Sequence, residues 1–228
     1  MIFNLHILVG MQIIIDIHVH TKEFSPGDSI LSIDEAIDNA KTMGLDGLCF
    51  TDHDNTGTYD IAENLSRLHH MLIIPGIEVF TTDGDILVFG LDRMPQKPIS
   101  SAELIDLVHK MGGAAVSAHP YRPGFRGLGD LTASFSKTLG IEVLNGRTSP
   151  KDNLRALKTA SENGMPSFGG SDAHTPEEVG RFATKFPKDI ENIQGFIRAI
   201  NDNDVQPVFH NGQDYSVLET LASPVLNH

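Results

Sequence analysis

Five of the eleven histidines in this sequence stand where a run of apolar residues ends. These five are His18, His20, His53, His119 and His174. Carboxylates lie close to them, since Asp52 precedes His53 and Asp172 lies two residues before His174. Imidazole nitrogens and carboxylate oxygens are ligands that zinc, manganese and iron accept in proteins. The residue types therefore indicate a site for divalent metal ions.

His18 and His20 have the spacing of two metal ligands on one β-strand. Side chains at positions i and i+2 of a strand point to the same face, so two imidazole rings can reach one cation. A single pair of this kind is more often a packing or surface feature. Repetition favours the metal site, because Glu78, His119 and Asp172 fall at the same end of their expected strands.

Strand-length apolar runs alternate with helix-length amphipathic segments along the chain. Strands are expected at residues 12–20, 47–51, 71–80, 85–91, 114–118, 141–144, 167–170, 181–186 and 205–209. Helices are expected at residues 33–43, 58–70, 101–111, 152–163 and 189–203. Two of these helices begin with capping boxes, Ser32 with Glu35 and Ser100 with Glu103.

This alternation predicts an α/β fold with a parallel sheet. About seven strand–helix units in one chain favour a closed, TIM-like barrel over an open sheet. The carboxyl ends of barrel strands meet at one face, where such barrels carry their active sites. The histidines and carboxylates at the strand ends are therefore expected to converge in one pocket.

Length and composition are those of a globular protein with one domain. The chain has 228 residues, 40% hydrophobic and 21% charged, and we expect a single domain over residues 1–228. Met11 stands just before the first expected strand, so the hypothesis is that residues 1–10 are an upstream extension. Signal-peptide features and membrane-length apolar stretches are missing, so we expect a cytoplasmic location and no membrane contact.

Net charge argues against nucleic acid as a partner, and cysteine content excludes sites that need several thiols. The formal net charge of −13 repels nucleic acid and anionic lipid, so no duplex nucleic acid is expected as a partner. Cys49 is the only cysteine, which excludes an internal disulfide and a thiolate metal cluster. Its apolar neighbours predict a buried strand position.

Five short motifs follow one another in a characteristic order. They are Asp16-Ile17-His18-Val19-His20-Thr21, Thr51-Asp52-His53-Asp54, Pro75-Gly76-Ile77-Glu78, Ala118-His119-Pro120 and Gly170-Ser171-Asp172-Ala173-His174. Together they resemble the PHP (polymerase and histidinol phosphatase) family over residues 13–174. Members of that family are distorted seven-stranded (β/α)7 barrels that hold two or three divalent ions, usually Mn, Zn or Fe. Many of them hydrolyse phosphoesters.

The resemblance implies a ligand set for each ion. Around the first ion it places His18, His20, Glu78 and Asp172. A second ion takes His53 and the loop aspartate Asp28, with Glu78 as the bridge. A third ion takes His119 and His174. Asp28 is the loop ligand if residues 28–32 replace the family's Asp-Gly-Thr-Leu-Thr stretch.

Asp85 departs from the family pattern. Many trinuclear members have a histidine before the Ile-Leu pair that here follows Asp85. An aspartate can ligate a hard cation, which would keep a third metal site. The alternative is that Asp85 is a solvated turn residue after Gly84 and that only two ions bind tightly. Ligation by Asp85 is the favoured expectation.

The function implied by the resemblance is that of a metal-dependent phosphoesterase. It would hydrolyse a phosphomonoester or phosphodiester of a small nucleotide or metabolite, using a hydroxide held between two ions. Asp172 or His174 would protonate the leaving group. Arg122 and Arg147 follow strand ends and are expected to clamp a phosphate, with a solvated loop position as an equal alternative.

Some polar residues are expected to support the metal ligands, and other histidines are expected to lie away from the metal site. Asp16 would orient a ligand histidine or cap the bottom of the barrel, and Glu142 would face the metal cavity. The loop of residues 121–129, which carries Arg122 and Arg126, is expected to be the most mobile segment. The histidines expected not to bind metal are His6, His69, His70, His109, His210 and His228.

Two other functions stay open. An amidohydrolase-type metallohydrolase also begins with a His-x-His strand, but such chains are usually longer and use a carboxylated lysine where this sequence offers Glu78. A metal-binding regulatory barrel without catalysis is the second alternative, because Asp85 replaces a ligand histidine.

Overall fold

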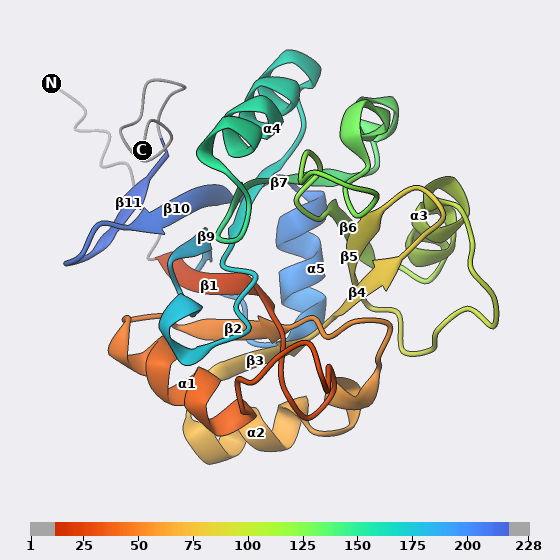
Figure 1. Cartoon of the computed structure of the whole chain (residues 1–228). Coiled ribbons are helices and arrows are strands. Elements are labelled where there is room, and N and C mark those ends of the chain that lie inside the picture. The colour runs from red at the N-terminus through yellow and green to blue at the C-terminus, as the bar shows by residue number, and fades with distance from the viewer. Residues whose placement is uncertain (1–11, 219–228) are drawn as a thin grey trace, which may run out of the picture.

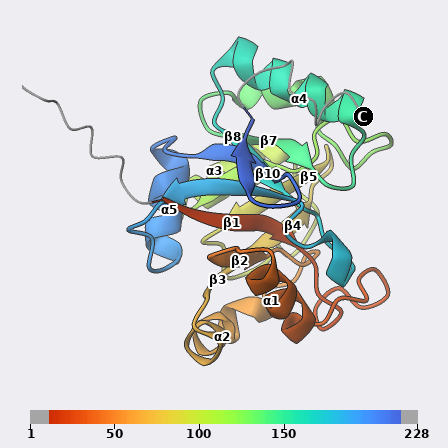
Figure 2. The ribbon, with the colours of Figure 1, turned by 90° about the vertical axis from the view of Figure 1, so that its left-hand side faces the viewer.

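The computed structural model describes residues 12–218, and its strands pair as two mixed sheets, with most helices around the outside and one helix across the middle (Figure 1). The expectations on residues 1–10, His6 and His228 lie outside the described residues. From the side, β1 runs through the middle of the molecule, with α1 and α2 on one side and α4 on the other (Figure 2). No helix within residues 12–218 is long and apolar enough to cross a bilayer.

The first sheet has six strands in the order β11-β10-β9-β1-β2-β3. Their bounds are β1 Gln12–Val19, β2 Gly47–Phe50, β3 Leu72–Pro75, β9 Phe182–Pro187, β10 Gln206–His210 and β11 Tyr215–Val217. β1, β2 and β3 are parallel to one another, whereas β9 is antiparallel to β1. Beyond β9, β10 pairs antiparallel with β9, and β11 pairs antiparallel with β10 at the edge of the sheet.

The second sheet has five strands in the order β4-β5-β6-β7-β8. Their bounds are β4 Ile77–Phe80, β5 Asp85–Phe89, β6 Ala114–Ser117, β7 Gly140–Asn145 and β8 Ser167–Gly170. β5 is antiparallel to both of its neighbours, as the expected hairpin partner of the preceding strand. β6, β7 and β8 are parallel.

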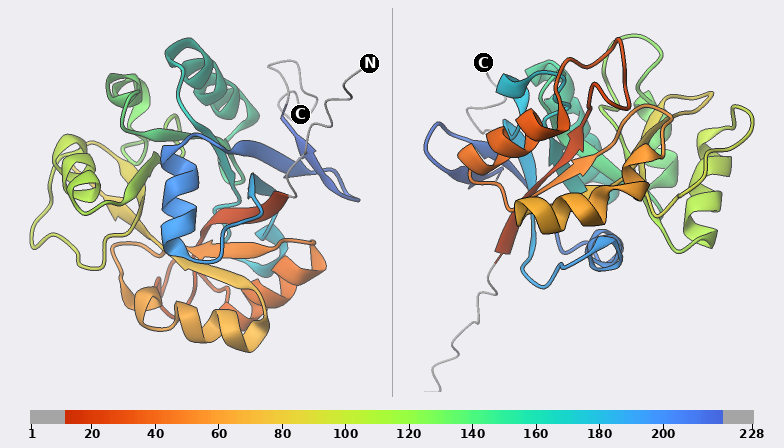
Figure 3. Two further views of the ribbon diagram at one scale, coloured as in Figure 1. Left: turned by 180° about the vertical axis from the view of Figure 1, so that it is seen from behind. Right: turned by 90° about the horizontal axis from the view of Figure 1, so that it is seen from below.

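Within residues 12–218, five α-helices and three 3-10 helices connect the strands. They are α1 Ile33–Thr42, α2 Ala62–His69, α3 Ser101–Lys110, α4 Pro150–Asn163, α5 Ile193–Asn201, η1 Gly57–Asp60, η2 Gly129–Phe135 and η3 Pro176–Glu178. Both expected capping boxes are present, at the starts of α1 and α3. Seen from behind, α5 lies across the middle of the strands (Figure 3). There Phe196 packs between Phe89 and Phe186, with ring centroids 4.9 Å apart in both pairs.

The α/β class is confirmed, but the described strands do not form one closed parallel ladder. The expected strand at residues 71–80 is two strands, because the chain passes from the first sheet to the second at Gly76. A Cβ there would lie 2.6 Å from the ring of Phe89. The two sheets also meet between β8 and β9. There the hydroxyl of Thr184 in β9 accepts the backbone N–H of Gly169 in β8 at 2.9 Å and donates to the carbonyl of Gly169 at 2.8 Å. A side chain thus takes the place of ladder hydrogen bonds where the sheets meet.

Gly169→Ala tests this junction. A Cβ at Gly169 would lie 2.4 Å from the carbonyl oxygen of Ala183, so the substitution forces β8 and β9 apart. We expect the free energy of unfolding to fall by about 1–3 kcal/mol, the usual cost of overpacking. Urea denaturation measures it.

The matched control is Gly195→Ala in α5, where the nearest atom would be 3.5 Å from the new Cβ. A helical glycine costs about 0.5–1 kcal/mol relative to alanine, so this variant should gain stability. Equal urea midpoints for the two variants would contradict the tight junction.

Candidate metal centre

Histidines and carboxylates from several strands meet at one end of the two sheets. His18 lies in β1 and Glu78 in β4, while His53, His119 and Asp172 follow β2, β6 and β8 within three residues. With His20, Asp28 and His174 they form three groups of possible metal ligands, and in each group all donor atoms lie within 4.8 Å of one another. The structure thus brings together eight of the nine residues expected to bind metal, the exception being Asp85.

The first group consists of His18, His20 and Asp172. The Nε2 atoms of the two histidines are 3.0 Å apart. Asp172 Oδ1 lies 3.5 Å from Nε2 of His18 and 3.3 Å from Nε2 of His20. All three side chains are buried.

The second group consists of His18, Glu78 and His119. Glu78 Oε1 is 2.7 Å from Nε2 of His119, and its Oε2 is 3.6 Å from Nε2 of His18. The same Oε2 lies 2.9 Å from Nδ1 of His53. Glu78 is therefore the carboxylate that faces the largest number of imidazoles, as expected of a shared ligand.

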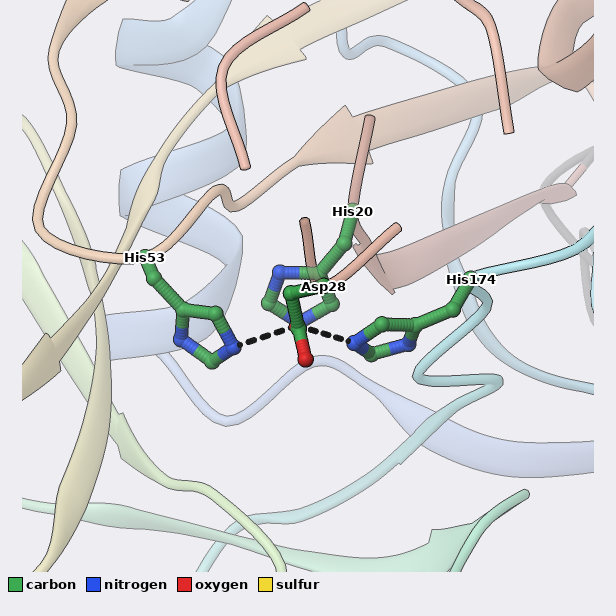
Figure 4. Close-up of side chains that lie close together, drawn as sticks. All are labelled: His20, Asp28, His53 and His174. Atoms are coloured by element: carbon green, nitrogen blue, oxygen red, sulfur yellow. Dashed lines mark hydrogen bonds and ion pairs between the residues drawn. The ribbon is translucent and has the colours of Figure 1, made fainter. Parts of the chain in front are cut away.

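The third group consists of His20, Asp28, His53 and His174 (Figure 4). Asp28 Oδ2 lies 3.0 Å from Nε2 of His53 and 2.7 Å from Nε2 of His174. The ring centroid of His20 is 4.4 Å from those of His53 and His174. His174 thus lies with Asp28, whereas the expected grouping paired it with His119. No group within residues 12–218 joins those two histidines.

These donors fit divalent cations. Burial raises the pKa of Asp172, but His18 and Arg122 outweigh it and hold that pKa well below its ordinary value. The pKa of Glu78 is likewise held low by His18 and His119. Its buried Oε2 lies 2.9 Å from Nδ1 of His53 but makes no well-directed hydrogen bond among the described residues. A buried ionised carboxylate needs a cation, and nitrogen and oxygen donors suit manganese, zinc or iron.

Glu142 faces the metal cavity, as its place in an apolar run predicts. Its Oε1 is 3.1 Å from Nδ1 of His18. Its Oε2 accepts the backbone N–H of His119 at 2.8 Å and the side-chain N–H of Asn145 at 2.9 Å. One carboxylate therefore orients the ring of His18 and the backbone of His119, which leaves Nε2 of His18 for the cluster.

Asp16 contacts the candidate ligand His18 through the backbone, because its Oδ1 accepts the backbone N–H of His18 at 3.3 Å. Its oxygens also accept backbone N–H groups from Ser171 and Gly180, each at 2.9 Å. Burial raises the pKa of Asp16 to about 6. These bonds fix the chain on both sides of Asp172 and His174.

Two further polar residues hold the site and were not predicted to do so. Asp52 accepts hydrogen bonds from the backbone and hydroxyl of Thr21 and from the hydroxyl of Ser25, which fasten the loop that carries Asp28. Asn145 donates to Asp172 at 3.3 Å. The only sequence signal was their polarity at a strand end.

The two arginines expected to bind phosphate lie in different surroundings. Arg122 reaches the cluster, where its guanidinium donates to Asp172 and to Oδ1 of Asn145. Arg147 lies 3.8 Å from Glu178 and is 42% exposed at the side chain. Arg147 thus lies on the rim, paired with a carboxylate that also accepts the backbone N–H of His174.

Arg126 is the arginine that the sequence did not single out. Its Nε is 2.6 Å from Oδ2 of Asp85 and its Nη2 is 3.1 Å from Nδ1 of His53. The backbone N–H of Asp85 also donates to the carbonyl of Arg126, at 2.7 Å. The loop expected to be the most mobile is therefore anchored at Arg126 by both backbone and side chain.

Asp85 is fully buried, so the alternative of a solvated turn is wrong. Burial and the nearby Glu78 raise the pKa of Asp85 to about 8. Its Oδ2 lies 3.9 Å from Nε2 of His119, farther than from the guanidinium of Arg126. Asp85 borders the cluster without joining any of the three groups.

Backbone strain marks the strand ends at this site. Asp54, His119 and Asp172 have φ values of 48°, 29° and 55°. Non-glycine residues rarely adopt positive φ, and they keep it where surrounding contacts hold them, often in active sites.

Metal loading should release protons. Burial lowers the pKa of His18, but Asp172 and Glu142 outweigh it and raise that pKa well above its ordinary value. His18 is thus protonated in the metal-free protein at pH 7 and must lose its proton to bind an ion. Burial lowers the pKa of His20 to about 4, so His20 contributes no proton. Metal affinity should therefore rise with pH.

Calorimetric titration with Mn²⁺ at pH 7, in two buffers of different ionisation enthalpy, measures the release, expected to be about one proton or more. Glu142→Gln removes a carboxylate that raises the pKa of His18, so this variant should release less. Identical heats in both buffers would show that His18 is neutral before loading.

Comparisons with known proteins agree with this geometry. The PHP domain model matches residues 16–130, and the PHP-associated model matches residues 150–205. The uncharacterized protein MJ1587 of Methanocaldococcus jannaschii is 29% identical over 163 residues, which cover 67% of this chain and 95% of that protein.

Two solved structures share the fold. A two-domain protein from Bacteroides vulgatus, containing a predicted PHP-like metal-dependent phosphoesterase, matches with a TM-score of 0.71 and 19% identity, over 88% of this chain and 66% of that one. PsfC from Pseudomonas syringae matches with a TM-score of 0.65 and 21% identity, over 87% of this chain and 91% of PsfC. The family model spans half of the sequence and contains the candidate ligands from His18 to His119. This chain belongs to the PHP domain family.

Proposed function

We propose that this chain is a metal-dependent phosphoesterase acting on a small phosphorylated substrate. The observation that carries the proposal is the meeting of two buried, ionised carboxylates, Glu78 and Asp172, with imidazole nitrogens in groups no wider than 4.8 Å. Family membership supports the same activity. The net charge of −13 agrees with a small substrate drawn in by a local cationic site rather than a long polyanion.

We propose two ions rather than three. The first would be held by His18, His20 and Asp172, and the second by Asp28, His53 and His174, with Glu78 as the carboxylate shared between them. His18 has one nitrogen for the cluster, because Glu142 engages the other at 3.1 Å. The group of His18, Glu78 and His119 therefore competes with the first group for the same lone pair.

The carboxylate of Asp85 would pair with the guanidinium of Arg126 instead of a third ion. Arg126 already provides a positive charge 2.6 Å from Asp85, and its Nη2 lies 3.8 Å from Oε2 of Glu78. A divalent ion at Asp85 would have to displace this arginine or share the carboxylate with it. Displacement would lose the ion pair of Arg126 with Asp85, and sharing would cost free energy through repulsion between the two cations.

The chain's own residues would bind and orient the phosphoryl group. When bound, the ions lower the pKa of a water molecule and offset negative charge on the phosphoryl oxygens. Arg122 and Arg126 lie on two sides of the cluster, where guanidinium N–H groups can donate to those oxygens. Asp172 is held ionised and His174 faces Asp28, so in this arrangement both act as ligands rather than proton donors.

Asp172→Asn should lower turnover of p-nitrophenyl phosphate by about a hundredfold or more, because it removes a ligand charge from the first group. His18→Ala should do the same and lower the metal content. His109→Ala, on the exposed face of α3, is the control that keeps activity. Full turnover by metal-loaded Asp172→Asn would disprove the proposed site. Hydrolysis of p-nitroacetanilide but not of the phosphate would instead favour an amidohydrolase.

Elemental analysis after saturation with Mn²⁺ should give two ions per chain, in the wild type and in Asp85→Asn. The substitution keeps the shape of the side chain but removes its charge, so a true ligand would be weakened. Three ions in the wild type and two in Asp85→Asn would restore Asp85 as the ligand of a third ion.

A further inference from the structure

Two exposed aromatic side chains border the metal centre. Phe125 is 75% exposed and Phe80 is 38% exposed, although large aromatic rings are usually buried. Their ring centroids are 6.0 Å apart in an edge-to-face arrangement. Phe125 immediately precedes Arg126 in the sequence, and Phe80 follows Glu78 by two residues.

The place of Phe80 follows from the geometry of β4. Residues two apart on a strand point to the same face, so Phe80 lies on the face of Glu78, one step nearer the end of the strand. The backbone N–H of Phe80 donates to Asp54 at 3.0 Å, and Asp54 follows the cluster residue His53. This bond fixes the backbone of Phe80 against the loop that carries a predicted ligand.

Arg126 connects the aromatic pair to the metal centre. Its Cζ lies 5.0 Å from the centroid of the Phe80 ring, while its Nη2 is 3.1 Å from His53. A phosphoryl group bound at the cluster and at Arg126 would direct its leaving group over these rings. Fastening of the loop alone does not explain Phe125, because Arg126 already anchors the loop and the Phe125 ring remains largely exposed.

A cavity of about 320 Å³ adjoins Phe80. Its wall includes Asp54, Met94, Pro95, Gln96 and Lys97. The volume is at the lower end for small-ligand sites. An apolar wall with a few polar groups suits a flat ring with a polar edge.

We propose that Phe80 and Phe125 form a subsite for a flat aromatic ring on the leaving group, such as a nucleobase. This inference rests on the proposed phosphoesterase function and narrows its substrate class to aromatic phosphoesters such as nucleotides. A nucleobase has a π-face that stacks on an aromatic side chain whatever its substituents, whereas ribose and glycerol have no π-face to offer. Arg126 would add a cation–π contact at the same place.

Adenosine 5′-monophosphate and ribose 5-phosphate test the subsite, because they share the phosphate and the sugar and differ in the base. For Mn²⁺-loaded protein, the ratio of their kcat/KM values should be about ten to a hundred in favour of the nucleotide. Phe125→Ala and Phe80→Ala should bring the ratio toward one. Ile30→Ala, which removes another side chain that is 72% exposed, is the matched control and should keep it.

A ratio near one in the wild type, or an unchanged ratio in Phe125→Ala, would overturn the subsite while leaving the phosphoesterase in place. The non-hydrolysable 5′-phosphonate analogues of adenosine and ribose separate the two proposals, because stacking requires no turnover. If neither ester is hydrolysed but the adenosine analogue binds more tightly and loses this preference in Phe125→Ala, the subsite stands and the activity fails. Equal binding of the two analogues would reject the subsite whatever the turnover.

Discussion

The rest of this structure depends on the balance of negative charge buried at one end of the sheets. The two carboxylates that are held ionised, Glu78 and Asp172, are 1% exposed, and the side chains of Asp85 and Glu142 beside them are fully buried. Each ionised carboxylate would cost several kcal/mol without a partner in the low-dielectric interior. Imidazole and guanidinium groups must therefore come from several strand ends at once, and the chain accepts positive φ at His119 and Asp172 to present them. The requirement for charge balance thus fixes the ends of the strands.

Local patterns predicted the helices and strands better than they predicted how the strands pair. Capping boxes gave the starts of α1 and α3, since a cap is a contact between residues three apart. The break between two strands at Gly76 could not be predicted, because residues 71–80 are a continuous apolar run. The need for a glycine there comes from the ring of Phe89, which belongs to another strand. Division into two sheets also depends on distant partners, such as Thr184 beside Gly169, which no local window contains.

The candidate metal ligands were recognisable because their residue types are rare in apolar runs and because side chains at parallel strand ends are expected to meet at one place. Which of those residues lie together was harder to predict from the sequence. His174 lies with Asp28, and this depends on a loop fastened by Asp52. The arginines show the same limit: Arg122, Arg126 and Arg147 all lie in polar loops, and only the folded backbone brings Arg126 against Asp85 while leaving Arg147 on the rim.

The position of β1 between β2 and β9 has a consequence for folding. The strand that carries His18 pairs on one side with nearby β2 and on the other with β9, where Ile14 lies opposite Lys185. Closing so long a loop is slow, and during synthesis β1 waits for its second neighbour with one edge uncovered. Such an edge can pair with other chains. Asp172 is translated just before β9, so completion of the candidate metal site and protection of that edge become nearly simultaneous events.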